Sequence, residues 1–182
     1  MEIVEPIRDM EKIQKMKEYL KAKSDRDYML FIIGINTALR ISDILKLKVK
    51  DVRGKTHLEL KETKTRKRKK FKMNSFLISE LQRYTRDMDD DDYLIHSTRS
   101  TKRPIDRFRA YAILNEAAEK VGIQGRIGTH TMRKTYGYHF YQKTKDLETL
   151  RQLLNHSRIE VTRRYIGIDQ DYIDQVTSEF VL

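Results

Sequence analysis

The sequence predicts an α+β fold that is mostly α-helical, a single domain of 182 residues with a small antiparallel β-sheet in the form of a hairpin. Three observations predict it. Only two prolines and seven glycines interrupt the chain, so most segments can form helices joined by short loops. Apolar residues recur at helical spacing over most of the length and alternate with polar residues in one basic segment. No internal repeat or linker divides the chain, whose length suits one core.

Three helices are predicted before residue 50. Apolar residues at helical spacing predict an amphipathic helix over residues 7–23, and Ser24 is placed to cap a second helix over 25–39. The run YMLFIIGINTAL in this second helix is apolar on every side, which is typical of a helix in the centre of a core. Ser42 is placed to cap a third, short helix with the sequence DILKLKV.

The period changes at His57. In HLELKETKTRKRKKFKM, apolar and polar residues alternate at both ends of a polar, basic middle, which predicts a β-hairpin with strands near 57–62 and 69–73. A helix follows over 75–88. Its predicted apolar face consists of Phe76, Leu77, Leu81 and Tyr84.

The second half of the chain returns to helices. Residues 93–95 predict a short strand, and Pro104 suits the first turn of a helix that runs to Val121 and stops at Gly122. Thr129 is placed to cap the helix that carries HTMRKTYGYHFYQK. Shorter helical segments are predicted over 147–154 and 159–165, and an amphipathic C-terminal helix over 169–180.

Composition narrows the class of partner. The net charge of +11 and pI of about 9.7 predict a polyanionic partner, with nucleic acid ahead of an acidic membrane surface. The absence of cysteine excludes disulfides, thiolate zinc sites and a cysteine nucleophile. The longest uncharged stretch, residues 28–39, is too short to span a bilayer, and no signal peptide is visible. We therefore expect a soluble, cytoplasmic protein that contacts no membrane. The acidic run 87–92 is interpreted as a solvated loop and not as a metal site.

Four polar segments are candidates for a functional site, although each alone has an ordinary structural explanation. In TALRISDIL, Arg40 follows the apolar helix and Asp43 stands three residues later. A local ion pair at a helix end explains an isolated pair of this kind, but an arginine braced there can also present its guanidinium to a phosphate.

The basic hairpin is the second segment. Residues 61–72 of it carry eight cations in twelve residues, with Glu62 as the only acid among the twelve. Like charges on a short ribbon repel one another unless a polyanion lies alongside, so contact with DNA is favoured over a solvated charge run. The eight cations are Lys61, Lys64, Arg66, Lys67, Arg68, Lys69, Lys70 and Lys72.

The third segment is THTMRKTYGYHFY. His130 and Arg133 are three residues apart and lie on one face of the predicted helix. His130 falls in the first turn, where the positive end of a helix favours an anion. A metal ion is disfavoured here because Arg133 would repel it and no carboxylate accompanies the pair.

The fourth segment is LLNHSRIEVTRRYIG, in which His156 precedes Tyr165 by nine residues. A core position beside Ile166 is the ordinary explanation of Tyr165. A tyrosine hydroxyl is a poor nucleophile unless neighbouring cations favour its phenolate, and this segment offers such cations. They are Arg158, Arg163 and Arg164.

Taken in order, these motifs resemble the catalytic domain of the tyrosine recombinase family, of the phage integrase and Xer-like type, from about residue 7 to residue 180. The resemblance implies that Tyr165 is the nucleophile and that Arg40 and Arg133 are the two motif arginines. It assigns the two motif histidine positions to His130 and His156.

The resemblance also assigns a hairpin lysine and an acidic residue. Counting back from FKMN matches the family's catalytic lysine best to Lys64, although a shift in register would move the role to Lys61 or Lys67. Asp43 matches the acidic position that supports the site. The family chemistry implies no metal and no cofactor, since protein cations stabilise the phosphate.

The implied activity is site-specific recombination through a covalent 3′-phosphotyrosine intermediate. A type IB topoisomerase-like nicking and closing enzyme and a non-catalytic DNA-binding regulator are the alternatives. The implied partner is double-stranded DNA, and we expect self-association on DNA through residues 169–182. The residues predicted to bind DNA are Lys61, Arg66, Lys67, Arg68, Lys69, Lys70, Arg103 and Arg107.

Family members normally carry a separate helical core-binding domain ahead of the catalytic one. The resemblance predicts that residues 1–182 form the catalytic domain and that the core-binding domain is absent. The chain is then either an excised piece or a minimal stand-alone protein. We expect the protein to act on the nucleoid.

Overall fold

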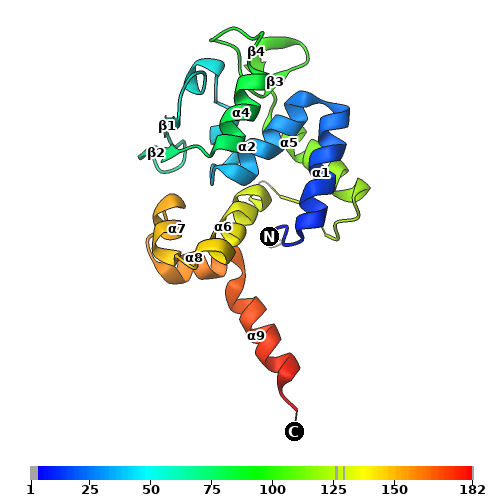
Figure 1. Cartoon of the computed structure of the whole chain (residues 1–182), viewed down its shortest axis with the longest axis vertical. Helices are drawn as coiled ribbons and strands as arrows, with labels where there is room; N and C mark the ends of the chain where they lie inside the picture. Colours follow the sequence, from blue (N-terminus) through cyan, green and yellow to red (C-terminus); the bar gives the residue numbers. More distant parts are fainter. Residues whose placement is uncertain (1–3, 126, 129, 182) are drawn as a thin grey trace.

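The computed structural model describes residues 4–125, 127–128 and 130–181, and it confirms the mostly helical α+β fold (Figure 1). Helix α2 (Asp25–Asn36) lies in the centre of the upper part, where α1 (Met10–Lys23), α4 (Ser75–Tyr84), α5 (Arg107–Lys120) and two small hairpins surround it. Every residue of α2 from Arg26 to Gly34 is buried, as its uniformly apolar sequence predicts. Ser24 caps α2 by accepting a hydrogen bond from the Asp27 amide, also as predicted.

The basic hairpin is present. Strands β1 (His57–Lys61) and β2 (Arg68–Lys72) pair antiparallel with Leu58 opposite Phe71. A second hairpin pairs β3 (His96–Ser97) with β4 (Ser100–Pro104). The short strand predicted over 93–95 lies just before β3, and β4 was not predicted.

The lower part of the molecule contains the remaining helices. Helix α6 (Thr131–Thr144) packs against α2, and α7 (Leu147–Leu153) and α8 (Ile159–Ile166) pack beneath it. Two apolar clusters result, a large one around α2 and a small one between α6, α7 and α8. The small cluster consists of Ala38, Leu150, Leu154, Ile166 and Ile168.

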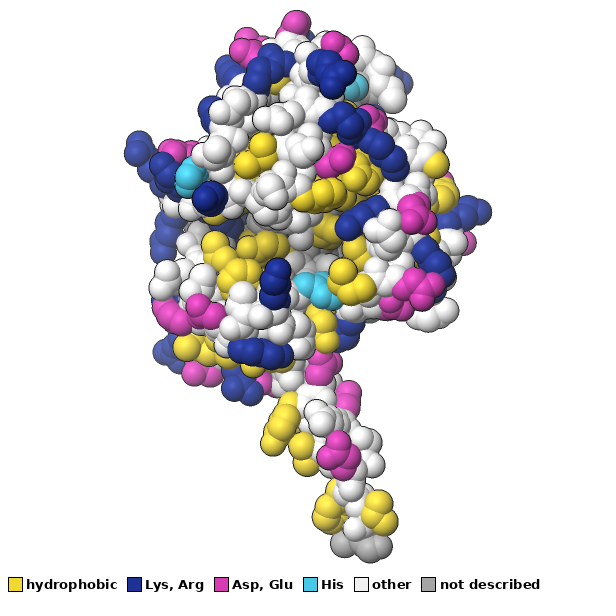
Figure 2. Space-filling view, viewed as in Figure 1, with side chains coloured by type: hydrophobic (Ala, Val, Ile, Leu, Met, Phe, Trp, Pro, Cys, Tyr) yellow, Lys and Arg dark blue, Asp and Glu magenta, His cyan; other side chains and the backbone are white. Residues whose placement is uncertain are grey.

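Helix α9 (Ile168–Glu179) projects away from the rest of the molecule, with the C-terminus at its far end (Figure 1). Apolar side chains lie exposed along this projection in Figure 2, and Tyr172 is 64% exposed. The other exposed apolar residues there are Ile173, Val176, Phe180 and Val181.

Several sequence predictions were wrong in their details. The helix predicted over 25–39 ends at Asn36, because Asn36 and Thr37 side chains bond the carbonyls of Ile32 and Ile33 and the chain then turns into left-handed Ala38. The predicted short helix capped by Ser42 is α3 (Ile41–Ile44) followed by a 3-10 turn, η1 (Val49–Asp51).

The helix predicted from Pro104 starts later. Pro104 ends β4, and the side chain of Asp106 caps α5 by accepting from the Arg109 amide. The helix predicted over 75–88 ends at Tyr84, and Phe76 on its predicted apolar face is 44% exposed. The predicted cap at Thr129 lies outside the described residues.

Candidate active site

The six residues predicted to be catalytic come from segments that meet at the junction of the two apolar clusters. These segments are loops, a hairpin turn, the start of one helix and the end of another. Arg40 precedes α3, Lys64 lies in the β1–β2 turn, His130 and Arg133 open α6, His156 precedes α8, and Tyr165 lies near the end of α8.

Arg133 is fixed by backbone carbonyls. Its side chain is only 2% exposed, and its guanidinium donates to the carbonyl oxygens of Ala38 and, at 2.6 Å, of Leu154. Ala38 has a φ of +43°, a conformation that non-glycine residues rarely adopt, and this turns its carbonyl toward the arginine. Arg133 therefore joins the loop after α2 to the end of α7.

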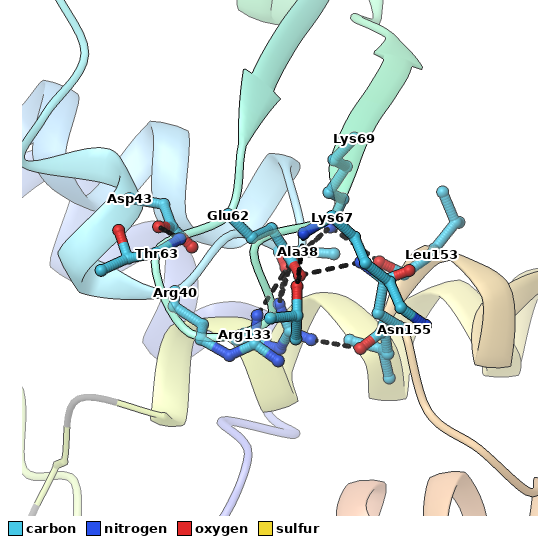
Figure 3. A network of polar contacts seen from close by, with 12 residues as sticks. Ala38, Arg40, Asp43, Glu62, Thr63, Lys67, Lys69, Arg133, Leu153 and Asn155 are labelled. Carbon is cyan, nitrogen blue, oxygen red and sulfur yellow. Dashed lines mark hydrogen bonds and ion pairs between the residues drawn. The ribbon is translucent and has the colours of Figure 1, made fainter.

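Arg40 lies beside the same junction. Its Nη1 atom stands 2.9 Å from the Oε1 atom of Glu62, a carboxylate that has no exposed surface (Figure 3). Nη1 of Arg133 is 3.9 Å from the same oxygen. Two guanidinium groups thus converge on the Glu62 carboxylate. Its negative charge offsets the repulsion between two buried positive charges.

Tyr165 points at both histidines. Its hydroxyl oxygen lies 3.2 Å from Nδ1 of His130, and the His156 ring lies edge-on at 5.0 Å between centroids. His156 is itself held by Thr162, whose hydroxyl is 3.0 Å from its Nδ1. The Lys134 ammonium lies over the Tyr165 ring at 5.3 Å.

Burial governs the protonation of these groups. It raises the pKa of Tyr165 even though the charges of Arg133 and Arg40 oppose the change, so the phenolate is less favoured than the sequence predicted. Burial, with the charges of the same two arginines, lowers the pKa of His130 and lowers that of His156 to about 4. At neutral pH the tyrosine is a phenol beside a neutral imidazole, which can accept its proton.

Lys64 is exposed and borders a cavity of about 490 Å³ next to the arginines. Arg40, His130 and Arg107 line the same cavity, together with Phe108, whose ring is 70% exposed. A charged and aromatic hollow of this kind can receive a phosphate and the nucleotide attached to it.

Asp43 lies beneath the hairpin turn. The side chain is buried, and its Oδ1 accepts a hydrogen bond of 2.8 Å from the backbone amide of Thr63 (Figure 3). The predicted supporting residue thus contacts the turn that carries Lys64.

Lys69 does not lie where the sequence placed it. It was predicted to contact DNA, but it is 7% exposed and its ammonium donates to the carbonyl oxygens of Leu153 at 2.7 Å and Ala38 at 3.2 Å. Strand alternation places it on the inner face of β2 with Phe71. Burial and the charge of Arg133 lower its pKa to about 7.

The other predicted DNA-binding residues are exposed. Arg107 borders the cavity, whereas Arg103 lies on β4. The hairpin residues of this group are Lys61, Arg66, Lys67, Arg68 and Lys70.

Sequence reasoning missed Glu62 and Asn155. The Asn155 amide donates to Oε2 of Glu62 at 2.8 Å, from a backbone with a φ of +51°. One signal for Glu62 was present, since it is the only acid among eight hairpin cations. Asn155 offered no such signal because its partner is 93 residues away.

Within the described ranges, no group of three or more His, Cys, Asp or Glu side chains is placed to hold a metal ion. The expectation that no metal or cofactor takes part stays a prediction. Among the same residues, no helix has the length and apolar character needed to cross a bilayer.

Comparisons with known proteins identify what the chain is similar to. The model of the phage integrase family matches residues 8–171. A probable integrase/recombinase of Bacillus subtilis, YoeC, is 56% identical over 171 residues, which cover 94% of this chain and 93% of the relative. Tyrosine recombinase XerA of Pyrococcus furiosus is 25% identical over 171 residues, which cover 92% of this chain and 59% of that protein.

Solved structures share the fold. The crystal structure of XerA recombinase matches with a TM-score of 0.76 and 20% identity, covering 96% of this chain and 65% of that one. A λ integrase dimer bound to a COC′ core site matches with a TM-score of 0.71 and 14% identity, covering 91% of this chain and 60% of that one. The chain thus spans about three-fifths of the length of these relatives and nearly all of the Bacillus protein.

Proposed function

The chain belongs to the phage integrase family, and from this membership and the geometry of the site we propose that it is a site-specific tyrosine recombinase. It would cleave and rejoin double-stranded DNA through a covalent 3′-phosphotyrosine intermediate. The observation that carries the proposal is the hydroxyl of Tyr165, which lies 3.2 Å from a neutral His130 in a site with two converging guanidinium groups.

The reaction follows from these positions. Arg40 and Arg133 bind the non-bridging oxygens of the scissile phosphate and stabilise the charge of the five-coordinate transition state. Arg133 does so through the guanidinium N–H groups that its two bonds to the Ala38 and Leu154 carbonyls do not use. The Tyr165 oxygen attacks phosphorus while its proton passes to His130, and the bond from phosphorus to the 5′-oxygen breaks. Lys64 gives a proton to that leaving oxygen, and His156 hydrogen-bonds the phosphate. A 5′-hydroxyl from another strand reverses the same steps, so the phosphodiester bond energy is kept.

DNA contact is supported by the exposed cations around the cavity. The phosphate backbone would lie along the hairpin and across the start of α5, where Arg107 lies, with Arg103 further along β4. Lys69 is left out of this surface because its ammonium is bound inside the protein. Since its substrate is DNA, the activity would take place on the nucleoid in the cytoplasm.

The test is covalent capture on nicked suicide duplexes of randomised sequence, which lose the 5′-hydroxyl strand after cleavage. We expect a protein–DNA adduct that resists denaturant with the wild-type chain and none with Tyr165→Phe, while both bind DNA alike. An adduct on Tyr165→Phe would refute the assignment of the nucleophile. Absence of any wild-type adduct would favour a DNA-binding regulator.

A second assay separates the two enzymatic possibilities. Two duplexes that carry the captured site are incubated with the protein, alongside a supercoiled plasmid with one copy of the site. Exchange of strands between the duplexes supports a recombinase. Relaxation of the plasmid without exchange would instead identify a type IB topoisomerase-like activity.

We also propose that α9 of one copy docks on a second copy when DNA holds the two together. The helix exposes an apolar face and carries no basic residue. Its acidic residues are Asp169, Asp171, Asp174 and Glu179. A hollow of about 280 Å³ between α1, α2, α4 and α6 offers the complementary surface, with apolar walls that include Met10 and Phe76 and with Lys17 and Lys143 at its rim.

Sedimentation of the protein on site-bearing DNA tests this contact. The double substitution Ile173→Ser and Val176→Ser should leave one-copy binding intact and weaken the two-copy complex. Gln170→Ser and Gln175→Ser on the same helix form the matched control. Equal assembly by both double variants would contradict docking through the apolar face.

A further inference from the structure

Glu62 is a buried carboxylate at the centre of the site, and the proposed reaction gives it no role. Its Oε1 atom lies 2.9 Å from Nη1 of Arg40 and 3.9 Å from both Lys69 Nζ and Arg133 Nη1 (Figure 3). One oxygen thus stands within 4 Å of three cations. A buried anion in such a position offsets the mutual repulsion of the cations around it.

The second oxygen of Glu62 is fixed separately. Oε2 accepts a hydrogen bond of 2.6 Å from the hydroxyl of Thr65 and one of 2.8 Å from the amide of Asn155. Burial alone would raise the pKa of Glu62, but these bonds and the charge of Arg40 outweigh it and lower the pKa. Glu62 therefore stays ionised at neutral pH.

The backbone of Glu62 closes the turn that carries Lys64. Its amide donates to the carbonyl of Lys67, and its carbonyl accepts from the amide of Arg66, each at 3.0 Å. The next residue, Thr63, is bound by Asp43. Two buried acids thus anchor the residues immediately before Lys64, and one of them also holds the arginines.

Resting on the proposed recombinase function, we propose that Glu62 is a positioning residue of this site. Its carboxylate ties the turn of the hairpin to the Arg40–Arg133 pair, so that Lys64 and the two guanidinium groups address the same phosphate. Lys64 itself is exposed and lies on a polar turn, and among the described residues no side-chain hydrogen bond or ion pair holds its ammonium. The carboxylate couples the group that protonates the leaving oxygen to the groups that bind the phosphate.

A change of leaving group tests this coupling. In ordinary DNA the 5′-oxygen must take a proton as its bond to phosphorus breaks. In DNA with sulfur at that bridging position, the leaving group departs as a thiolate. A thiolate needs no proton, because the pKa of a thiol is about 8.5 whereas that of water is about 15.7. A defect in the placement of Lys64 should therefore disappear with sulfur, whereas a defect in phosphate binding should remain.

The experiment measures single-turnover cleavage at the captured site with both substrates. Glu62→Gln should cleave ordinary DNA about 10- to 100-fold more slowly than the wild type, the usual cost of losing a group that orients a reacting residue. It should regain most of that loss on the sulfur substrate, as should Lys64→Ala, with DNA affinity unchanged. Glu59→Gln, which removes an exposed acid from the same hairpin, should cleave both substrates at the wild-type rate.

A milder variant keeps the test valid if Glu62→Gln fails to fold. Thr65→Val removes the hydrogen bond to Oε2, together with a long one of 3.4 Å from the Lys67 amide, and leaves the carboxylate in place. It should slow cleavage of ordinary DNA by about 3- to 10-fold, the effect expected from the loss of a hydrogen bond. On the sulfur substrate the cleavage rate should return to that of the wild type. In a Glu62→Gln background that folds, Thr65→Val should slow cleavage less than it does in the wild-type chain.

Two results would overturn the positioning role. One is wild-type cleavage of ordinary DNA by both variants. The other is an equal loss on the two substrates, which would mean that Glu62 acts through the arginines or through folding alone. Failure of the wild-type chain to form any adduct is a different outcome, since it would refute the proposed function itself.

Discussion

A single methyl group added at Gly137 should disturb the nucleophile without touching it. Gly137 lies in α6 and faces Ile166 of α8, the residue that follows Tyr165 in the sequence. A Cβ atom built on Gly137 would meet Cγ2 of Ile166 at 2.8 Å. Ordinary contact starts at 3.4 Å, so α8 must retreat by about 0.6 Å or the Ile166 side chain must turn.

The two effects of Gly137→Ala can be set against each other. Alanine favours a helix over glycine by about 1 kcal/mol, whereas overpacking a core costs about 1–3 kcal/mol. The net loss of stability is then about 1 kcal/mol, which lowers the melting temperature by about 2–4 °C in a chain of this size. Cleavage should suffer more, because a misplacement of about 1 Å at a reacting group can cost about 100-fold in rate. We expect a fall of about tenfold.

Thermal unfolding and single-turnover cleavage measured on the same samples test this reasoning. Ile166→Leu moves the branch away from the added methyl group, so Gly137→Ala combined with Ile166→Leu should recover part of the lost rate. Wild-type cleavage by Gly137→Ala would refute the claim that contact between α6 and α8 positions Tyr165. So would a rate loss that the second substitution leaves unchanged.

Three further changes test other parts of the structure. Because burial lowers the pKa of Lys69 to about 7, the unfolded chain binds more protons between about pH 7 and 10, and stability should rise with pH across that window. In urea titrations Lys69→Met should lose this rise, whereas Lys70→Met should keep it. Lys67→Gln should make the slope of log DNA affinity against log salt concentration shallower by about 1, measured by fluorescence anisotropy. Ser24→Ala should cost about 1 kcal/mol of unfolding free energy, measured in urea, by removing the cap of α2.

Local sequence was enough to predict the elements whose signals are local. The Ser24 cap, the buried α2 and the basic hairpin each depend on residues a few positions apart, and all three are present. The start of α5 shows where this fails, because Pro104 and Asp106 are both good residues for a helix start. Pairing of β4, which the sequence did not reveal, with β3 next to the strand predicted over 93–95 decided between them.

The residues of the site were predicted from sequence motifs, whereas their contacts join segments that lie far apart in the sequence. Nothing near Lys69 in the sequence shows that its strand face meets the end of α7, 84 residues away, so it was assigned to DNA. The pKa of Tyr165 illustrates the same limit. Cations beside it in the sequence suggested a phenolate, but burial by residues from other segments outweighs them. Burial is a property of the folded chain, and the sequence around one residue does not reveal it.

The most direct measurement is the identity of the residue that carries the DNA. After covalent capture, nuclease trimming and trypsin digestion, the peptide that begins at or just before Tyr165 runs to the C-terminus without another lysine or arginine. We expect a nucleotide 3′-phosphate on this peptide, with fragment ions that place it on Tyr165. A modification on Tyr172, on any other residue, or through a 5′-phosphate would contradict it.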